Sequence, residues 1–476
     1  MFKKILSIVL IMGIIASLCA CGNKEENSQT IPTLPPEKLE NNVVNPDDDI
    51  DVGSFEVVDT FDIELDNYNS NILLCAGGEY TLHGASQNIM VCVDSEEDVV
   101  LNLKNAHIQS SNGPCLFIRT ANSILINLVD DTKNKFETSG NNTYEALNAV
   151  IYSTYNIEFG GKGTLEIVSS VAHAVKAAEC LSIHDGTYII DSTTNCFDAK
   201  DEIVIDGGSF NLRSTGGDGI ETDGEIIINN GDFTIDVFKD GIKADSNIVI
   251  HDGNFNIVNA TEGIESKTNV VINNGKFNIA TVDDCINAIG TLTINNGNIH
   301  AVSETNDAID ANLGIEINDG YIYAVGTTVR EGAIDTDENG IVINGGTIIG
   351  LGETNSDTFE GEQRAIVLNV STVRIVKSVT IKNDKGEVVF HVDVEPYKDG
   401  FEDTEDVVEE TRPSGAGPSH NGNRPGRGDS SRPGGNSSSV GTDSMLYLSI
   451  FLSDKSFVDG LYQIFINDEY FEQITL

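Results

Sequence analysis

The feature that most constrains this chain is a short pattern that returns mostly every 22 or 23 residues between Gly163 and Ile348. Its clearest copies begin at Ile228, Ile250 and Ile272, and each reads Ile-x-x-Gly-x-Phe-x-Ile with Asn, His or Asp before the glycine. A fixed period of this length indicates a solenoid, because each repeat buries its apolar face only when neighbouring repeats stack on it. The repeat therefore decides the fold class before any local propensity is considered.

Each repeat has room for three short strands. Ile226 and Ile228 alternate with polar residues, Phe233 and Ile235 alternate again after an Asn-Gly turn, and a third strand starts at Ile242 after an Asp-Gly turn. We predict an all-β fold, a right-handed parallel β-helix with three strands and about 22 residues per coil, followed by a C-terminal β cap; the handedness is that of parallel β crossovers in general.

Stacked coils lie about 4.8 Å apart, so equivalent residues should form ladders along the solenoid. We expect an inward aromatic ladder and a turn ladder whose amides bond one another. The aromatic ladder would consist of Phe210, Phe233, Phe255 and Phe277. The turn ladder would consist of Asp206, Asn229, Asn273, Asn295, Asn318 and Asn344.

The first residues have the features of a secretory signal. Lys3 and Lys4 precede an apolar run, Ile5 to Leu18, which is too short for a confident membrane span. The run ends in Leu-Cys-Ala-Cys, which resembles a bacterial lipobox with Cys21 as the lipid-attachment residue. We expect an extracytoplasmic protein anchored to the membrane by this lipid; the alternative is a cleaved and freely secreted protein.

Changes in composition divide the rest of the chain. The predicted domains are a signal peptide (1–20), the lipid-attachment cysteine with an acidic disordered linker (21–58), the β-helix (59–355), a β cap in two parts (356–400 and 445–476) and a disordered insertion rich in Pro, Gly, Ser and Arg (401–444). Within the β-helix, residues 130–145 are expected to form a polar excursion from the wall.

Charge and cysteine content exclude several classes of site. The chain has 28 Lys and Arg against 75 Asp and Glu, a formal net charge of −47, which argues against a nucleic-acid partner because a polyanion needs a basic surface. The cysteines beyond residue 21 lack the CxxC spacing of zinc sites. We expect them to be small buried or half-buried free thiols rather than a disulfide framework: Cys75, Cys92, Cys115, Cys180, Cys196 and Cys285.

The third strand of the repeat carries the candidate chemistry. Alignment on its first apolar residue places carboxylates at two positions, two residues before and one residue after, with Gly, Ala or Cys between. Five consecutive coils, from Asp218 to Asp307, have an acid at the first position, whereas Asn195 and Gly332 interrupt the column on either side. The candidate metal ligands are Asp218, Glu221, Asp240, Glu262, Glu265, Asp284, Asp307 and Asp310.

A bare ladder of carboxylates is unfavourable, because unit charges about 5 Å apart repel by about 1 kcal/mol even in bulk water. Interleaved lysines such as Lys243 and Lys267 could relieve the repulsion, and so could hard cations such as Ca²⁺, which prefers oxygen ligands. The small residue between the two acids would leave room for a backbone carbonyl to approach an ion. The alternative is a solvated acidic face that binds no specific ion.

The repeats at Asp218-Gly219-Ile220-Glu221, Asp240-Gly241-Ile242-Lys243 and Glu262-Gly263-Ile264-Glu265 resemble those of a bacterial surface carbohydrate-binding β-helix family. The resemblance covers about Val99 to Ile348. It implies a polysaccharide-lyase-like fold, calcium bound in the solenoid, and binding of cellulose or of acidic sugars such as polygalacturonate. It supports as metal ligands Asp218, Asp240, Glu262, Asp284 and Asp307.

Three functions remain open at this point. The first is a non-catalytic surface lipoprotein that binds cellulose or a uronate-bearing polysaccharide through its calcium-loaded acidic face, with Tyr188, Tyr321 or Tyr323 as sugar-stacking candidates. The second is a calcium-dependent lyase with Lys243 as base, although acidic neighbours should keep that lysine protonated; paired carboxylates would equally allow hydrolysis. The third is a structural or adhesive surface protein that binds no sugar.

Overall fold

The computed structural model describes residues 55–57, 61–140, 144, 146–170, 172–326, 332–352, 359–371, 376–394 and 447–476. All of these residues belong to the second of two compact units, Val43–Leu476. The expected signal peptide, Cys21 and the insertion 401–444 lie outside the described residues. No described helix has the length and apolarity needed to cross a membrane.

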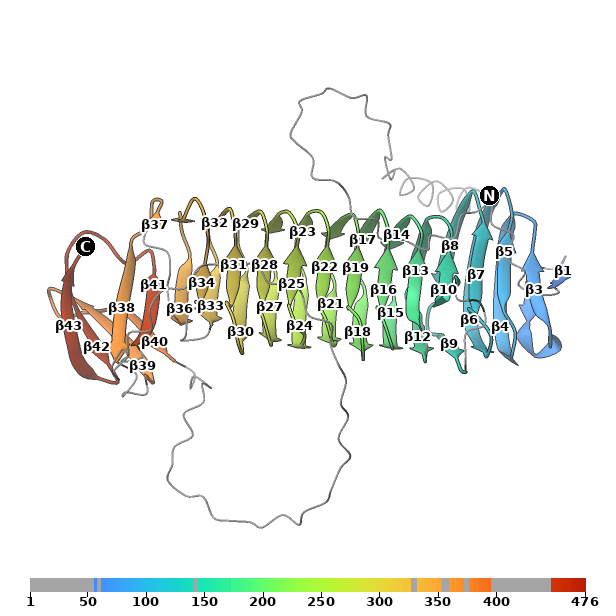
Figure 1. Ribbon diagram of the computed structural model, residues 1–476, viewed down its shortest axis with the longest axis horizontal. Coiled ribbons are helices and arrows are strands. Elements are labelled where there is room, and N and C mark those ends of the chain that lie inside the picture. The colour runs from blue at the N-terminus through green and yellow to red at the C-terminus, as the bar shows by residue number, and fades with distance from the viewer. Residues whose placement is uncertain are drawn as a thin grey trace, which may run out of the picture. The chain divides into compact units, whose positions relative to one another are not determined.

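The described residues form a parallel β-helix, which confirms the predicted fold class (Figure 1). One of its faces is a sheet of thirteen parallel strands, which we call sheet A. Its strands are β1 (Phe55–Val57), β3 (Asn71–Leu74), β5 (Val91–Asp94), β7 (Leu116–Thr120), β10 (Ala149–Ser153), β13 (His173–Ala177), β16 (Phe197–Ala199), β19 (Ile220–Thr222), β22 (Ile242–Ala244), β25 (Ile264–Ser266), β28 (Ile286–Ala288), β31 (Ile309–Ala311) and β34 (Ile334–Asp335).

The other two faces are parallel ladders, which the long strands β4 (Gly78–Gln87) and β6 (Asp98–Ser110) connect at the N-terminal end. β2 (Asp62–Glu64) pairs with β4, and the 3-10 helix η1 (Leu65–Asn67) follows β2. The first ladder contains β8 (Ser123–Leu128), β11 (Ile157–Gly161), β14 (Cys180–Ile183), β17 (Glu202–Ile205), β20 (Glu225–Ile228), β23 (Ile248–Ile250), β26 (Val270–Ile272), β29 (Thr291–Ile294), β32 (Gly314–Ile317), β35 (Ile341–Ile343) and β37 (Phe359–Glu360). The second contains β9 (Lys133–Thr138), β12 (Thr164–Ser169), β15 (Thr187–Ser192), β18 (Ser209–Ser214), β21 (Asp232–Asp236), β24 (Asn254–Asn259), β27 (Lys276–Thr281), β30 (Asn298–Ser303), β33 (Tyr321–Val325) and β36 (Thr347–Gly352).

The coils stack in the register that the repeat predicts. Phe233 pairs with Phe255, and successive rings of the expected aromatic ladder are stacked with centroids 4.6–4.7 Å apart. The turn ladder also forms: the Asn295 amide donates to Asn273 at 2.8 Å, with His251 taking one position in the row. Gly231 has φ 147°, and a Cβ there would lie 2.7 Å from the Phe233 ring, which explains why each turn needs glycine before its aromatic residue.

Two boundaries differ from the sequence-based prediction. Phe55–Val57, assigned to the linker, forms β1 and pairs with β3. The expected excursion at 130–145 is wrong for Lys133–Thr138, which is β9 and pairs with β6 and β12. Its polar Asn134 is buried inside the wall, where its side chain accepts from the Ala106 N–H and donates to the Thr164 carbonyl. The strand was missed because an inward position is occupied by a polar amide, so the sequence lacks the apolar alternation by which strands are recognised.

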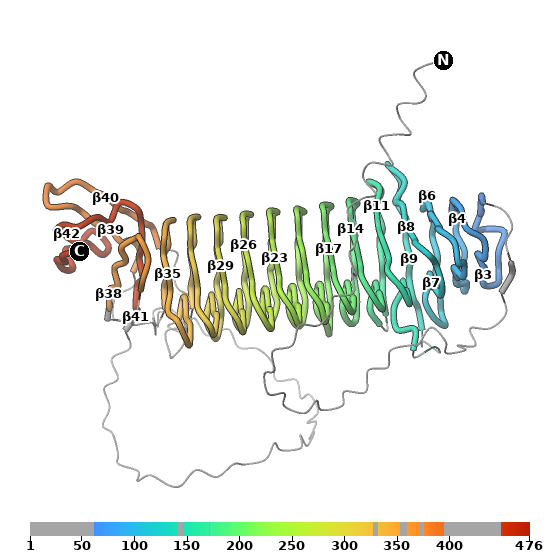
Figure 2. Tube along the Cα trace, turned by 90° about the horizontal axis from the view of Figure 1, so that it is seen from above, coloured from blue at the N-terminus to red at the C-terminus, as the bar shows by residue number. Residues whose placement is uncertain are grey.

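The C-terminal end of the solenoid changes to antiparallel pairing. β36 pairs with β41 (Tyr447–Ser453), and β41 pairs with β38 (Ala365–Ser371). A separate four-stranded sheet contains β39 (Ser378–Asn383), β40 (Val388–Asp393), β42 (Leu461–Ile466) and β43 (Glu469–Thr475). Figure 2 shows these strands gathered at one end of the coil stack, where they cover what would otherwise be an open sheet edge.

The six cysteines in the described part of the chain are free thiols. Five are buried, as expected, but Cys75 is exposed, which corrects the prediction for that residue. Burial raises the pKa of the Cys92 and Cys115 thiols to about 12, so these two side chains serve as small core residues rather than reactive thiolates.

Candidate functional site

The acidic residues singled out in the sequence lie along sheet A. Ile220, Ile242, Ile264, Ile286 and Ile309 pair in sequence from strand to strand, so the acids flanking them occupy equivalent positions on successive coils. Asp335 follows Ile334 in the same register and extends the second column by one coil. We use the term acidic wall for these residues: Asp218, Glu221, Asp240, Glu262, Glu265, Asp284, Asp307, Asp310 and Asp335.

The first column of the acidic wall is tied to the backbone. Asp218 Oδ1 accepts the Asp240 N–H at 2.9 Å, and Asp284 Oδ1 accepts the Asp307 N–H at 3.0 Å. Asp240 Oδ1 accepts the Glu262 N–H at 3.2 Å, and Asp307 Oδ1 accepts the Gly332 N–H. One oxygen of each aspartate thereby holds the next coil, so the position of its second oxygen is set by the β-helix itself.

Two groups of carboxylates converge within the acidic wall. Oxygens of Asp240, Glu262 and Glu265 lie within 4.8 Å of one another, and so do oxygens of Asp307, Asp310 and Asp335. We call these the central cluster and the distal cluster. The distal cluster takes its acids from two coils. Asp307 and Asp310 belong to one coil, and Asp335 belongs to the next, whose first-column position is Gly332. Asp335 was not among the metal ligands expected from the sequence.

The central cluster already contains a protein cation. Lys243 Nζ donates to Asp240 Oδ2 at 2.6 Å and to Glu265 Oε2, and Asn287 donates to Glu262 Oε2 at 3.1 Å. Burial disfavours the charged form of Lys243, but these hydrogen bonds outweigh burial and raise its pKa. This confirms the expectation that Lys243 is an ion-pair partner. Lys267, the other expected partner, pairs with Asp245, which is not a member of the cluster.

The remaining carboxylates are only partly compensated. Burial, followed by repulsion from Asp218 and Asp198, raises the pKa of Glu221 to about 7. Burial, followed by repulsion from Glu265 and Asp240, raises that of Glu262 to about 7. Burial and the neighbouring acids Asp283 and Asp307 raise the pKa of Asp284 to about 8. Burial also raises that of Asp218, which is 0 % exposed and whose Oδ2 lies 3.6 Å from Lys239 Nζ.

Toward the N-terminus, the column is neutralised by other side chains. Asp198 lies 3.1 Å from Lys176 Nζ and 3.3 Å from His173 Nδ1. The Asn195 amide donates to Asp198 at 3.2 Å and also to Glu221. At the interruption, the Asn195 amide thus bonds the acids on either side of it, and Lys176 supplies the positive charge that pairs with Asp198.

The small residue between the two acid columns has a structural cause that the sequence did not show. A Cβ on Gly219 would lie 2.4 Å from the Gly241 carbonyl oxygen, and one on Gly241 would lie 2.6 Å from that of Gly263. These carbonyls accept ladder hydrogen bonds from Ile220 and Ile242. The close approach of the next coil is therefore a structural reason for the small residue at these coils, and its expected role beside an ion stays a prediction.

Aromatic side chains are distributed differently from the sequence-based expectation. Tyr188 is fully buried between Phe159 and Phe210, and Tyr323 is 4 % exposed, so neither can stack on a sugar. Tyr321 is 42 % exposed. The residue that sequence reasoning missed is Phe238, which is 67 % exposed and comes two positions before Asp240. The sequence could have indicated this, because Phe238 follows the inward-facing Val237 directly and so stands where the alternation after β21 predicts an exposed polar residue.

A second polar surface follows β18, β21, β24, β27 and β30, where a shallow groove of about 630 Å³ runs across successive coils. Its side chains bond one another along the solenoid: the Asn278 amide donates to Asn256 at 2.8 Å, and the Asn254 amide donates to Asp232 at 2.7 Å. Some hydrogen-bonding capacity of these amide groups is therefore already taken up by neighbouring coils.

The donor set of the acidic wall fits a hard divalent cation. Ca²⁺ prefers carboxylate and carbonyl oxygens, and each cluster brings three carboxylates together on rigid strands. Burial, followed by repulsion from neighbouring acids, raises the pKa values of Glu262 and Asp284, and a bound cation would favour their ionised forms. The central cluster would exchange its Lys243 ammonium for the ion, or share the carboxylates with it.

Known proteins share similarity with this chain. Residues 68–308, half of the chain, match a family model described as carbohydrate-binding domain-containing protein. No curated protein sequence matches the chain. A solved structure of a polysaccharide lyase-like protein from C. thermocellum, a gadolinium derivative, is similar at 16 % identity and a TM-score of 0.31, over 61 % of this chain and 86 % of that one.

Proposed function

The chain belongs to the family of carbohydrate-binding domain-containing proteins, and from this premise we propose that it is a non-catalytic surface lipoprotein that holds a uronate-bearing polysaccharide on its calcium-loaded acidic wall. The observation that carries the proposal is the convergence of three carboxylates in each of two clusters on consecutive strands of one sheet. A bound calcium ion would supply positive charge that both the wall and a sugar carboxylate can coordinate.

The rigidity of the acidic wall supports a binding role. Since Asp218 and Asp240 each accept a backbone N–H of the next coil, their second oxygens are fixed at the spacing of the strands, about 4.8 Å. Cations bound along the wall would meet carboxylates that are already in place and would cost little further ordering of the protein. An extended, repeating polyanion would then be held through several such cations.

Phe238 favours a sugar ligand over a purely structural role for the cation. Phe238 comes two residues before Asp240 in the chain and is 67 % exposed, so most of its ring lies outside the solenoid core. Its ring offers an apolar face to the C–H groups of a pyranose while the neighbouring carboxylates provide the polar contacts. The chain contains no tryptophan, so phenylalanine and tyrosine are its only large aromatic platforms.

The state of Lys243 supports binding rather than β-elimination. A lyase needs a base that accepts a proton near neutral pH, whereas Lys243 is held as an ammonium by Asp240 and Glu265 and its pKa is raised. The imidazole of His173, which lies beside Asp198, has its pKa lowered to about 4 by burial, which makes it a weak base.

Calorimetric titration tests the proposal. Chelator-treated full-length protein is titrated with Ca²⁺, and then with polygalacturonate in the presence and absence of Ca²⁺. We expect saturable Ca²⁺ binding that creates affinity for polygalacturonate, and loss of both in the double variant Asp240→Asn with Glu262→Gln. Asp232→Asn, which removes one charge from a different face and leaves an acceptor for Asn254, is the matched control.

Each other outcome has a defined meaning. Absence of saturable Ca²⁺ binding would disprove the proposal. Ca²⁺ binding that raises the melting temperature without creating polygalacturonate affinity would instead favour the structural or adhesive alternative. Release of unsaturated oligogalacturonides, followed by the ultraviolet absorbance of the C=C bond that each cleavage creates, would favour the lyase.

A further inference from the structure

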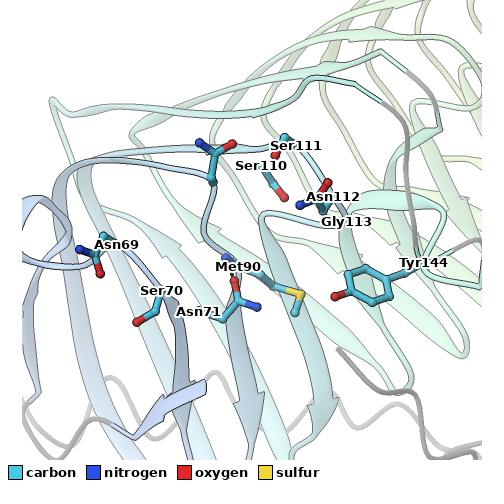
Figure 3. Close-up of a pocket in the computed structure, with 10 residues that line it drawn as sticks. Asn69, Ser70, Asn71, Met90, Ser110, Ser111, Asn112, Gly113 and Tyr144 are labelled. Carbon is cyan, nitrogen blue, oxygen red and sulfur yellow. Dashed lines mark hydrogen bonds between the residues drawn. The ribbon is translucent and has the colours of Figure 1, made fainter. Parts of the chain in front are cut away.

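A pocket of about 320 Å³ lies in the N-terminal coils, apart from the acidic wall (Figure 3). Four asparagines and three serines line it together with Met90, Gly113 and Tyr144. Its volume is at the lower end of the range for small-molecule pockets, which suits one sugar residue rather than a chain.

The pocket is built from corners of successive coils. Residues 69–71, 88–90 and 110–113 lead into β3, β5 and β7, and Ile72, Val91 and Leu116 pair in register in those strands. The same corner of the later coils carries the first acid column of the wall. The repeat therefore presents amides and hydroxyls at its N-terminal coils where it presents carboxylates further along.

The lining of the pocket is uncharged. None of the ten residues around it is acidic or basic, although the whole chain has a formal net charge of −47. Amide and hydroxyl groups both donate and accept, which suits the hydroxyls of a neutral sugar. A uronate carboxylate would find no cation among these residues and would pay an uncompensated desolvation cost.

One side of the pocket is apolar. Tyr144 and Met90 belong to a cluster with Cys92, Phe117 and Tyr152 on the outer face of sheet A. In Figure 3 the ring of Tyr144 lies on the side opposite Asn69 and Ser70, with its hydroxyl end toward Met90. A ring on one side and amides on the other match the amphipathic faces of a pyranose.

The walls of the pocket are held by hydrogen bonds. Asn71 Oδ1 accepts the Met90 N–H at 2.9 Å, which fixes the plane of the Asn71 amide. Asn88 has φ 59° and donates its N–H to the Gln109 carbonyl at 2.7 Å. A Cβ on Gly113 would lie 2.7 Å from Tyr144 Cδ2, so glycine at this position lets the ring pack where it does. Such a fixed set of donors and acceptors reduces the ordering cost of binding.

We infer that this pocket binds one uncharged pyranose residue, at an end or branch of a glycan, without a metal ion. The inference rests on the carbohydrate binding proposed above but assigns a different place and a different chemistry to it. The acidic wall would hold the charged part of a polysaccharide, and the pocket would select a neutral residue.

Titration of the full-length protein in excess chelator tests the inference. The probes are neutral hexasaccharides, namely cellohexaose, mannohexaose, xylohexaose and N-acetylchitohexaose, with trigalacturonate as the charged comparison. We expect saturable binding of at least one neutral probe and none of trigalacturonate. Tyr144→Ala removes the ring and should weaken the neutral probe about tenfold, a typical value for an aromatic contact.

Asn71→Asp is the second variant, since it keeps the acceptor for the Met90 N–H while replacing an amide donor with a charge. It should also weaken the neutral probe at least tenfold with little change in melting temperature. The acidic-wall double variant Asp240→Asn with Glu262→Gln should bind the neutral probe as the parent does.

The inference is overturned if no neutral probe binds in chelator, or if one binds equally well to Tyr144→Ala and Asn71→Asp. These results are separable from failure of the proposed function. Loss of Ca²⁺-dependent polygalacturonate binding in the wall variant alone would assign that binding to the acidic wall. Loss of neutral-sugar binding in the pocket variants alone would assign the neutral sugar to the pocket.

Discussion

The Asp218 side chain accepts the backbone N–H of Asp240 across one coil, at 2.9 Å, while its own second oxygen lies 3.6 Å from Lys239 Nζ. One fully buried carboxylate therefore joins two coils and also forms part of the acidic wall. The same relationship recurs between Asp284 and Asp307, so a side chain offered as a ligand is also a structural element of the solenoid.

Substitutions at Asp218 should separate these two roles. Asp218→Asn keeps an acceptor for the Asp240 N–H and removes a buried charge, so the melting temperature in chelator should stay the same or rise. Asp218→Ala leaves that N–H without its acceptor and should lower stability by about 1–3 kcal/mol. Thermal unfolding followed by circular dichroism measures both; equal melting temperatures for the two variants would contradict the role of the hydrogen bond.

The stability of the metal-free protein should fall as pH rises. The pKa values of Glu221 and Glu262 are raised to about 7 and that of Asp284 to about 8, above those of unfolded carboxylates near 4. The folded state thus binds more protons between these values, and the stability present below pH 4 is lost as pH rises through 7 to 8. Melting temperatures in chelator from pH 4.5 to 8.5 test this sign.

The triple variant Glu221→Gln, Glu262→Gln and Asp284→Asn is the control for this pH dependence. It should flatten the profile, because its side chains do not titrate. Ca²⁺ should also reduce the loss of stability toward pH 8, since cation binding favours the ionised carboxylates. A melting temperature of the parent in chelator that rises between pH 5 and 8 would refute the explanation.

Lys243 should compete with Ca²⁺ for the central cluster. Its ammonium already donates to Asp240 and Glu265, so a cation must displace it or share its partners. Lys243→Gln should increase Ca²⁺ affinity severalfold and lower the melting temperature in chelator, because the buried Asp240 and the half-buried Glu265 lose their counter-ion. Calorimetry and thermal unfolding measure the two effects, with Lys267→Gln, which removes a lysine paired elsewhere, as control.

Phe238→Ala should separate sugar binding from cation binding. The side chain is 67 % exposed and supplies no oxygen ligand, so Ca²⁺ affinity and melting temperature should change little. If the ring stacks on the polysaccharide, affinity for polygalacturonate in Ca²⁺ should fall about three- to tenfold. Val258→Ala, at another exposed apolar residue, is the matched control; unchanged polygalacturonate affinity in Phe238→Ala would exclude the stacking role.

Lipid attachment at Cys21 is tested by fractionation of bacterial cells that express the full chain. Cys21→Ser should move the protein from the membrane fraction to the medium or to the soluble extracytoplasmic fraction, whereas Cys19→Ser should remain with the membrane. Equal distribution of parent and Cys21→Ser would contradict anchoring and favour the secreted alternative.

The fold and the alignment of the acidic wall could be predicted from the sequence because a period of 22 residues fixes which side chains stack. Once Ile242 pairs with Ile264, the positions of Asp240 and Glu262 follow from the two-residue spacing. Asn134 shows the limit of this reasoning, since a buried amide that bonds the backbone has no apolar signature.

The sequence by itself determined the solenoid, its register and the row of carboxylates, because these depend on local alternation and on repetition. Only the tertiary structure decided which oxygens converge, that Lys243 lies within the central cluster, that the small residues accommodate the next coil, and that Tyr144 meets residues 69–71 and 88–90 around a pocket. Rotamers, coil-to-coil packing and contacts between non-equivalent corners set these features, and a linear period specifies none of them.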